Sequence, residues 1–214
     1  VYKKVLVILY NVANFYKEYQ QEDDSKFKKS DNLMDKWIIS LTEELNETVQ
    51  KNLEGYNTIK ACKAIRKYVE DLSTWYLRNS RDRLNEGDEK ARKTLRYVLE
   101  KAIRIMAPVI PFVTENIYRD INNDSSVHLE NWPEPNPKSI DKDLISQMEH
   151  VREIVSIALR KRDQNQMGLK WPLSKVEVAS EHKIPESLKD IIKQEINVKK
   201  FIEKDYKENL EVEL

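Results

Sequence analysis

Hydrophobic residues recur at steps of three and four over long stretches of this chain, which is the spacing of one face of an α-helix. The pattern predicts five long helices, over about residues 2–19, 33–54, 59–83, 88–107 and 141–162. Pro111 suits the first turn of a shorter helix through Ile121, and any of residues 30–32 can cap the second long helix. Most loops between these segments are short, which favours antiparallel neighbours.

The few glycines fall between periodic segments, where they predict helix ends. Gly55 and Gly87 each follow such a segment, where a helix C-terminus favours a residue in the left-handed conformation. Pro108 stops or kinks the fourth long helix, because it lacks an amide donor and clashes with the preceding turn.

The period changes after Gln164. Val176 and Val178 alternate with polar residues, as do Leu210 and Val212, and this alternation predicts half-buried strands. A weaker strand is expected over 196–202, and a short helix is expected after Pro185. The predicted fold is therefore mainly α, an antiparallel bundle of about five long helices followed by a small α+β module.

The expected domains are residues 1–165 and 166–214, and the bundle is expected to have one core. Its predicted members carry the inward positions of the four helices after the first: Trp37, Ile38, Leu41, Ile65, Leu72, Leu95, Val98, Val151 and Val155. The same spacing places Phe15, Ile59, Ala91, Ala102 and Ile105 on the apolar faces of their helices.

Composition excludes several classes of protein. No stretch of the 214 residues approaches the roughly 18 apolar residues of a membrane span, so no membrane partner is expected. The single cysteine excludes an intramolecular disulfide and suits a reducing cytoplasm. Lysine plus arginine equals aspartate plus glutamate at 37 each, so any contact with nucleic acid must use a local basic patch. The chain begins without methionine, which indicates a piece of a longer polypeptide.

The chemistry of common enzymes is missing from the sequence. There is no Walker phosphate loop, no dinucleotide fingerprint and no zinc-ligand spacing, so neither a cofactor nor a metal is expected in this chain. The three histidines lie in three different segments without a triad or metal pattern. The neighbours Glu43 and Glu44 are interpreted as solvated on a charged helix face. These residues describe a non-catalytic helical domain.

One segment combines aromatic and basic residues at the end of a predicted helix. Trp75 and Tyr76 are followed within a few residues by Arg78, Arg81 and Arg83. An aromatic ring offers a base a stacking platform, and a guanidinium binds phosphate with two hydrogen bonds. The same pattern also fits a core tryptophan beside a solvated face. The residues alone leave both interpretations open.

Several segments, in order, resemble the anticodon-binding region of class I aminoacyl-tRNA synthetases of the isoleucyl, valyl and leucyl group. Leu33-Met34-Asp35-Lys36-Trp37-Ile38-Ile39-Ser40 is similar to the Leu-x-Asp-x-Trp-Ile-x-Ser helix start of that family. The most specific segment is Asp71-Leu72-Ser73-Thr74-Trp75-Tyr76-Leu77-Arg78, followed by Arg81 and Arg83. Residues 9–16 and the Ala-Pro…Pro…Glu turn at 106–115 also match.

Two further segments resemble the isoleucyl branch of the group. Residues 126–133 look like its Ser-Val-His-Leu-x-x-Trp-Pro segment. Arg162 through residues 168–173 looks like the basic stretch ending in Pro-Leu at the family's C-terminal junction, with Trp171 in place of a second basic residue. The resemblance extends to about residue 180, and the last 35 residues match loosely.

The resemblance implies a fragment, since the family's HIGH and KMSKS catalytic signatures and its editing domain are absent here. The implied parent is a cytoplasmic, monomeric isoleucine-tRNA ligase that uses ATP and Mg²⁺, and this piece would hold the anticodon stem-loop of isoleucine tRNAs. By motif position the implied tRNA-binding residues are Asn11, Asn14, Trp75, Arg78, Arg81 and Arg83.

Two alternatives remain at the level of sequence. The chain could be the same domain of a valyl- or leucyl-tRNA synthetase, against which the segment at 126–133 argues. It could also be a helical protein–protein interaction module without any RNA role, which its zero net charge would suit.

Overall fold

The structure, a computed structural model, describes residues 2–21, 27, 30–122, 126–205 and 210–214. The chain divides into two compact units, Val1–Asp141 and Lys142–Leu214, here called the helical unit and the C-terminal unit. Most of the predicted loop over 20–32 lies outside the described residues.

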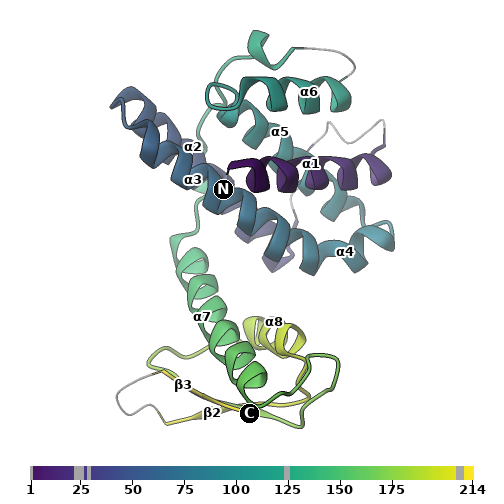
Figure 1. Ribbon diagram of the computed structural model, residues 1–214, viewed down its shortest axis with the longest axis vertical. Helices are drawn as coiled ribbons and strands as arrows, with labels where there is room; N and C mark the ends of the chain where they lie inside the picture. Colours follow the sequence, from purple (N-terminus) through teal and green to yellow (C-terminus); the bar gives the residue numbers. More distant parts are fainter. Residues whose placement is uncertain (1, 22–26, 28–29, 123–125, 206–209) are drawn as a thin grey trace. The chain divides into compact units, whose positions relative to one another are not determined.

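The helical unit contains the first four long helices that the sequence predicted, and Figure 1 shows α1 between α6 and α4. The segment that was predicted to form a single helix, the third, is divided into α3, η1 and α4. The elements are α1 (Tyr2–Tyr19), α2 (Leu33–Glu54), α3 (Thr58–Asp71), η1 (Leu72–Leu77), α4 (Arg78–Asn85), α5 (Glu89–Met106), α6 (Pro111–Ile121), η2 (Val127–Leu129) and η3 (Pro137–Ser139).

Local sequence sets most of these boundaries. The Asn32 side chain accepts hydrogen bonds from the amides of Met34 and Asp35 and so caps α2, and Asp88 caps α5 in the same way. Gly87 has a φ of 81°, as predicted for a residue after a helix end. The prediction for Gly55 is wrong: its φ is −86°, and Tyr56, with a φ of 55°, adopts the left-handed conformation instead.

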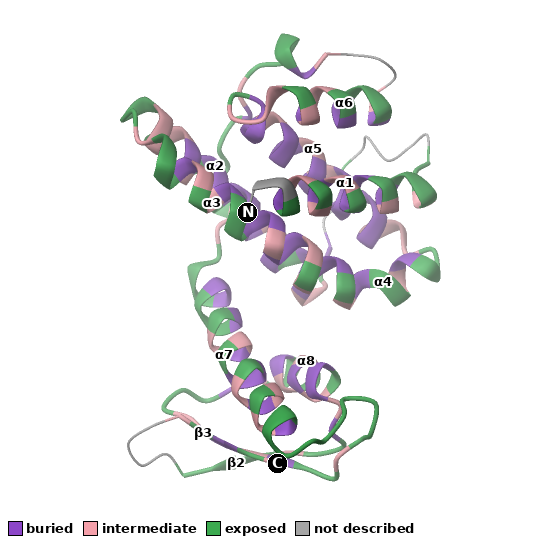
Figure 2. Ribbon diagram, in the orientation of Figure 1, coloured by how far each residue is buried: buried purple, intermediate pink, exposed green. Residues whose placement is uncertain are grey.

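Apolar side chains from all the long helices of this unit form its core, and Figure 2 shows α5 largely buried behind α1. The predicted inward face of α5 is confirmed, because every member of it is fully buried: Ala91, Leu95, Val98, Ala102 and Ile105. Two predictions about neighbouring helices are wrong. Ile59, at the start of α3, is 68% exposed.

Glu43 is the second of these corrections, because it is fully buried rather than solvated. Its carboxylate accepts hydrogen bonds from the Lys101 ammonium at 2.6 and 2.7 Å, from the Tyr97 hydroxyl at 2.9 Å and from the Asn136 amide at 2.9 Å. Buried charge is tolerated only when it is paired and hydrogen-bonded. Glu43 therefore joins α2 to α5 and to the segment before η3.

The predicted third helix contains one turn of π-helix. Helical hydrogen bonding continues from α3 through η1 into α4, but it widens to the π pattern over residues 72–77. Such a turn accommodates an extra residue, so the positions on either side of it no longer share a single α-helical face. Leu72, Tyr76 and Leu77 are buried, and Trp75 between them is half-exposed.

The C-terminal unit contains α7 (Lys142–Gln164), β1 (Val176–Ala179), α8 (Glu186–Ile196), β2 (Phe201–Lys204) and β3 (Glu211–Glu213). The strands form one sheet in the order β2-β1-β3, with β2 parallel and β3 antiparallel to β1. The predicted fold class, a helical bundle followed by a small α+β module, is confirmed. The weak strand expected over 196–202 begins later, at Phe201.

The division between units falls between Asp141 and Lys142, earlier than the expected boundary after residue 165. The reason is that α7 packs on α8 and against β3, so the fifth long helix belongs to the C-terminal unit. Val151 and Val155, which were expected in the bundle core, therefore lie in the C-terminal unit, and the prediction of one shared core is wrong.

Replacing Leu95 by alanine tests the packing of the helical unit. Leu95 is fully buried on α5, so Leu95→Ala is expected to lower the free energy of unfolding by about 2–5 kcal/mol through lost burial and a residual cavity. Urea unfolding measures the change. The control is Ile59→Ala, an aliphatic truncation at an exposed site, which is expected to stay within about 0.5 kcal/mol. Equal losses in both variants would contradict the assigned helix faces.

Candidate nucleic-acid interface

One exposed surface of the helical unit is formed by α1 together with η1 and α4. Two contacts bring α1 and α4 together: the Arg81 guanidinium lies 5.5 Å from the centroid of the Phe15 ring, and the Tyr19 hydroxyl donates a hydrogen bond to Asn85 Oδ1. The helix α1 also packs against η1. This surface, called the α1–α4 surface, carries five of the six predicted site residues: Asn11, Asn14, Trp75, Arg78 and Arg81.

The asparagines project from α1 away from the core. Asn11 and Asn14 are exposed, whereas Val12 and Ala13 between them are buried. Residues three apart are neighbours on a helix surface, so the two amides lie on one face. Each side-chain amide offers both donors and an acceptor to an unstacked base edge.

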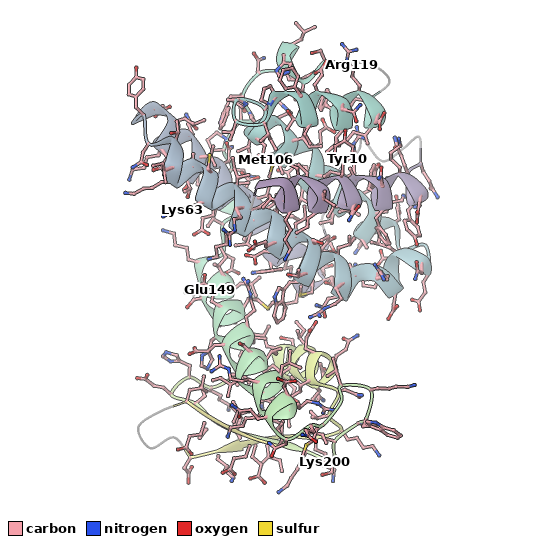
Figure 3. All side chains as sticks on the ribbon, in the orientation of Figure 1. Tyr10, Lys63, Met106, Arg119, Glu149 and Lys200 are labelled. Carbon is pink, nitrogen blue, oxygen red and sulfur yellow. The ribbon has the colours of Figure 1, made fainter. Side chains whose placement is uncertain are left out.

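A different flank of α1 is occupied by α6. Figure 3 shows Tyr10 on the side of α1 toward α6, where its hydroxyl donates to Asn116 Oδ1. The Lys17 ammonium reaches Asp120 at 3.0 Å. These contacts fix the rotation of α1 about its own axis, and with it the direction in which the asparagines point.

Trp75 lies in η1 and is half-buried, so the structure confirms partial exposure rather than full burial. The Arg78 guanidinium lies 5.8 Å from the centroid of its ring, within the range of a cation–π interaction. Asn79 Nδ2 donates to the Trp75 carbonyl at 2.9 Å. Indole and guanidinium are thus presented together at the surface.

Arg83, the sixth predicted residue, points inward and has internal partners. Its guanidinium donates to both oxygens of Asp35, at 3.0 and 2.8 Å, and its Nε donates to Asp88 at 3.0 Å. Asp35 is fully buried and the Arg83 side chain is 22% exposed. The structure therefore gives Arg83 a structural position between the starts of α2 and α5, apart from the exposed residues of the α1–α4 surface.

The Asp35 carboxylate is satisfied on several sides. Ser30 Oγ donates to it at 2.5 Å, and the Tyr76 hydroxyl donates at 3.0 Å. Burial, followed by the negative charge of Asp35, raises the pKa of Tyr76 well above its usual range. Burial opposes the charge on Arg83, but hydrogen bonds and attraction to Asp35 and Asp88 outweigh it and raise the pKa of Arg83. The arginine is cationic at any physiological pH.

Asp88 titrates at a lower pH than an ordinary aspartate. Burial alone would raise its pKa, but hydrogen bonds from the Ala91 amide and from Arg83 lower it overall. The carboxylate therefore remains ionised at neutral pH, where it caps α5 and holds Arg83.

Most of the sequence motifs behind the resemblance turn out to support the fold. In the helix start at 33–40, Asp35 holds Arg83, Trp37 is 1% exposed, and Ser40 Oγ donates to the Ser139 carbonyl at 2.9 Å. In the turn at 106–115, Glu115 accepts hydrogen bonds from the Val127 amide and the Ser126 hydroxyl, both at 3.0 Å. These contacts hold elements of the helical unit together and are not part of the α1–α4 surface.

The sequence analysis did not identify the roles of two residues, Phe15 and Asp35. Phe15, assigned to the core from its spacing, is half-buried and supports Arg81. Asp35 belongs to the motif at 33–40, but the sequence gave no sign of its structural role, because its partner Arg83 is 48 residues away. Among the described residues, there is no group of three or more His, Cys, Asp or Glu side chains that could hold a metal ion. No helix among the described residues has the length and apolar character to cross a membrane.

Comparison with known families identifies the domain. The family described as "Anticodon-binding domain of tRNA ligase" matches residues 35–178, which is most of the chain. The chain belongs to this family. The matched region includes Trp75, Arg78 and Arg81 but begins after Asn11 and Asn14, so the α1 part of the surface lies outside it.

The curated relatives carry the name isoleucine–tRNA ligase. The protein of Picrophilus torridus is 34% identical in an alignment that covers 95% of this chain and 21% of the relative. Those of Mycobacterium tuberculosis and Clostridium novyi are 34% and 35% identical, each over 92% of this chain and 19% and 20% of their own lengths. The chain thus spans about a fifth of the length of these relatives.

Removing Arg83 tests its structural position. Arg83→Met leaves Asp35 buried without its cation, and is expected to lower the free energy of unfolding by about 3–5 kcal/mol. The matched control is Arg81→Met, in which an exposed guanidinium and its cation–π contact with Phe15 are lost and the expected change is about 0.5–1 kcal/mol. Urea unfolding of both variants measures the difference. Equal stabilities would show that Arg83 does not hold the helix ends.

Proposed function

We propose that this chain binds the anticodon stem-loop of a tRNA through the α1–α4 surface. The single observation that carries the proposal is the juxtaposition of a half-exposed indole, Trp75, with the guanidinium of Arg78 in a member of the anticodon-binding family. Unpaired RNA bases stack on aromatic rings and on guanidinium planes, and arginines also grip the phosphates beside them.

The remaining residues of the surface extend this chemistry. Arg81 lies over Phe15 and adds a second cation next to an aromatic ring. Asn11 and Asn14 supply the hydrogen-bonding groups that can read the edge of a splayed base. Arg83 has no direct part in this proposal, because Asp35 and Asp88 hold its guanidinium.

We further propose that the tRNA is an isoleucine isoacceptor and that the chain is the anticodon-binding part of a cytoplasmic, monomeric isoleucine-tRNA ligase. The names of the relatives and the segment at 126–133 support this assignment over the valyl and leucyl alternatives. The complete enzyme would attach isoleucine to the tRNA with ATP and Mg²⁺, using domains outside this chain.

The RNA contacts can be tested with exposed variants of the α1–α4 surface. Arg81→Ala is expected to weaken binding to all tRNAs similarly and to lower the salt slope of log K by somewhat under one unit, because one phosphate contact is lost. The control is Lys63→Ala, which removes an exposed cation from the N-terminal half of α3 (Figure 3). Filter binding over a series of salt concentrations measures the slopes. Identical slopes for both variants would exclude Arg81 from the interface.

Trp75→Ala separates stacking from packing. Removal of a stacking ring is expected to cost about 1–3 kcal/mol of binding to isoleucine tRNA, with less loss of stability than the roughly 3–5 kcal/mol of a core ring, because Trp75 is half-buried. Binding is compared with an anticodon-altered copy of the same tRNA, alongside thermal unfolding. A large fall in melting temperature with intact anticodon discrimination would leave Trp75 as a packing residue only.

The same assignment makes a prediction about catalysis. Since the HIGH and KMSKS signatures are absent, the purified chain is expected to show no isoleucine-dependent exchange of pyrophosphate into ATP. Exchange above the background of a mock purification would contradict the proposal that activation of isoleucine resides outside this chain.

A further inference from the structure

The connection between α7 and β1 exposes three large apolar side chains in the C-terminal unit. Met167, Leu169 and Trp171 are 40%, 46% and 73% exposed. They alternate along the segment 167–171, and every residue from 163 to 172 is exposed. This segment, called the Trp171 loop, has no part in the α1–α4 surface.

A buried arginine holds the backbone of the Trp171 loop in place. Arg162 is 2% exposed, and its Nη2 donates to the carbonyls of Gly168 and Trp171, both at 2.6 Å, while Nη1 donates to the Ile196 carbonyl at 3.1 Å. Asn197 Nδ2 donates to the Leu169 carbonyl at 2.8 Å. The main chain is thus fixed from within, and the Trp171 indole is left outside.

The backbone around Trp171 is held by hydrogen bonds even though the Trp171 side chain is exposed. The Trp171 amide donates to the Gly168 carbonyl at 3.1 Å, so the four residues close a hydrogen-bonded turn with the indole at its end. A side chain presented on a fixed backbone loses little conformational freedom when a partner binds.

The charge around the Trp171 loop is mainly positive. Between residues 160 and 175 the chain has five cationic residues and one acidic residue, Asp163; of the five, Arg162 is buried and Lys175 pairs with Glu177. Leu173 forms a parallel bridge with Val198, and the Lys199 amide donates to the Leu173 carbonyl at 3.0 Å, so residues 197–200 run beside the loop. Lys170, Lys199 and Lys200 (Figure 3) are exposed and form no ion pair with any described side chain.

We propose that the Trp171 loop is a second RNA-binding surface, which takes an unpaired segment by stacking a base on the Trp171 indole while Lys170 and Lys199 contact the flanking phosphates. Stacking on an aromatic ring tolerates any base, and lysines bind phosphate as point charges. The inference shares with the proposed function only the class of partner, RNA, because it uses other residues in the other unit.

The charges favour RNA over a protein partner at this surface. A protein docked on the loop would have to desolvate several lysines, which are depleted in protein interfaces. A polyanion instead gains from the same lysines by releasing counterions.

Binding of the complete chain to a single-stranded 12-nucleotide RNA and to tRNA tests the inference. Trp171→Ala is expected to weaken binding of the 12-mer about 5- to 150-fold, the range that follows from loss of one stacked base. Trp171→Phe is expected to restore part of the affinity, since it keeps a smaller ring. Lys170→Ala is expected to lower the salt slope for the 12-mer by about 0.7.

The matched control is Phe112→Ala, which removes an aromatic ring that is 89% exposed in the helical unit. Absence of 12-mer binding by the unaltered chain, or a change under twofold in Trp171→Ala, would overturn the inference. Loss of tRNA binding in Arg81→Ala with no change in Trp171→Ala would overturn it while leaving the proposed function intact. Loss in Trp171→Ala but not in Arg81→Ala or Trp75→Ala would contradict the α1–α4 surface and support the Trp171 loop.

Discussion

The buried ion pair between Asp35 and Arg83 is the interaction on which the helical unit depends most. It joins the first turn of α2 to the last turn of α4, and Asp88 extends it to the start of α5. Since a buried carboxylate without its cation is strongly unfavourable, the three ends are held in one arrangement, and the exposed face of α4 is held with them.

The same ion pair explains why Arg81 and Arg83, two residues apart on α4, have different positions. Successive residues of an α-helix are about 100° apart, so Arg81 and Arg83 point to opposite sides of α4, about 200° apart. Arg83 turns toward Asp35, which leaves Arg81 over Phe15 at the surface. The π-helical turn just before α4 places Tyr76 against Asp35 while Trp75 remains half-exposed. The contact between Asp35 and Arg83 therefore fixes the orientation of α4, so that Arg81 faces outward.

Local features of the sequence were sufficient to predict the helices, because caps such as Asn32 and Asp88 and the apolar spacing of α5 act within a few residues. Features that depend on distant partners were not accessible in this way. Glu43 looked solvated because Lys101 lies 58 residues away, and α7 looked like part of the bundle because its apolar face does not reveal that α8 covers it. The left-handed Tyr56 gave no signal beside Gly55, the residue that usually adopts that conformation.

The distribution of charge shows why a net charge of zero is compatible with RNA binding. Several cationic side chains have partners inside the protein: Lys101 pairs with Glu43, Arg83 pairs with Asp35, and Arg162 donates hydrogen bonds to backbone carbonyls. Acidic side chains elsewhere in the chain balance the total, and salt screening limits the influence of each exposed charge to a range of about 8–10 Å. The affinity for a polyanion then follows from the few cations at the contact, and the total charge of the chain carries no information about it.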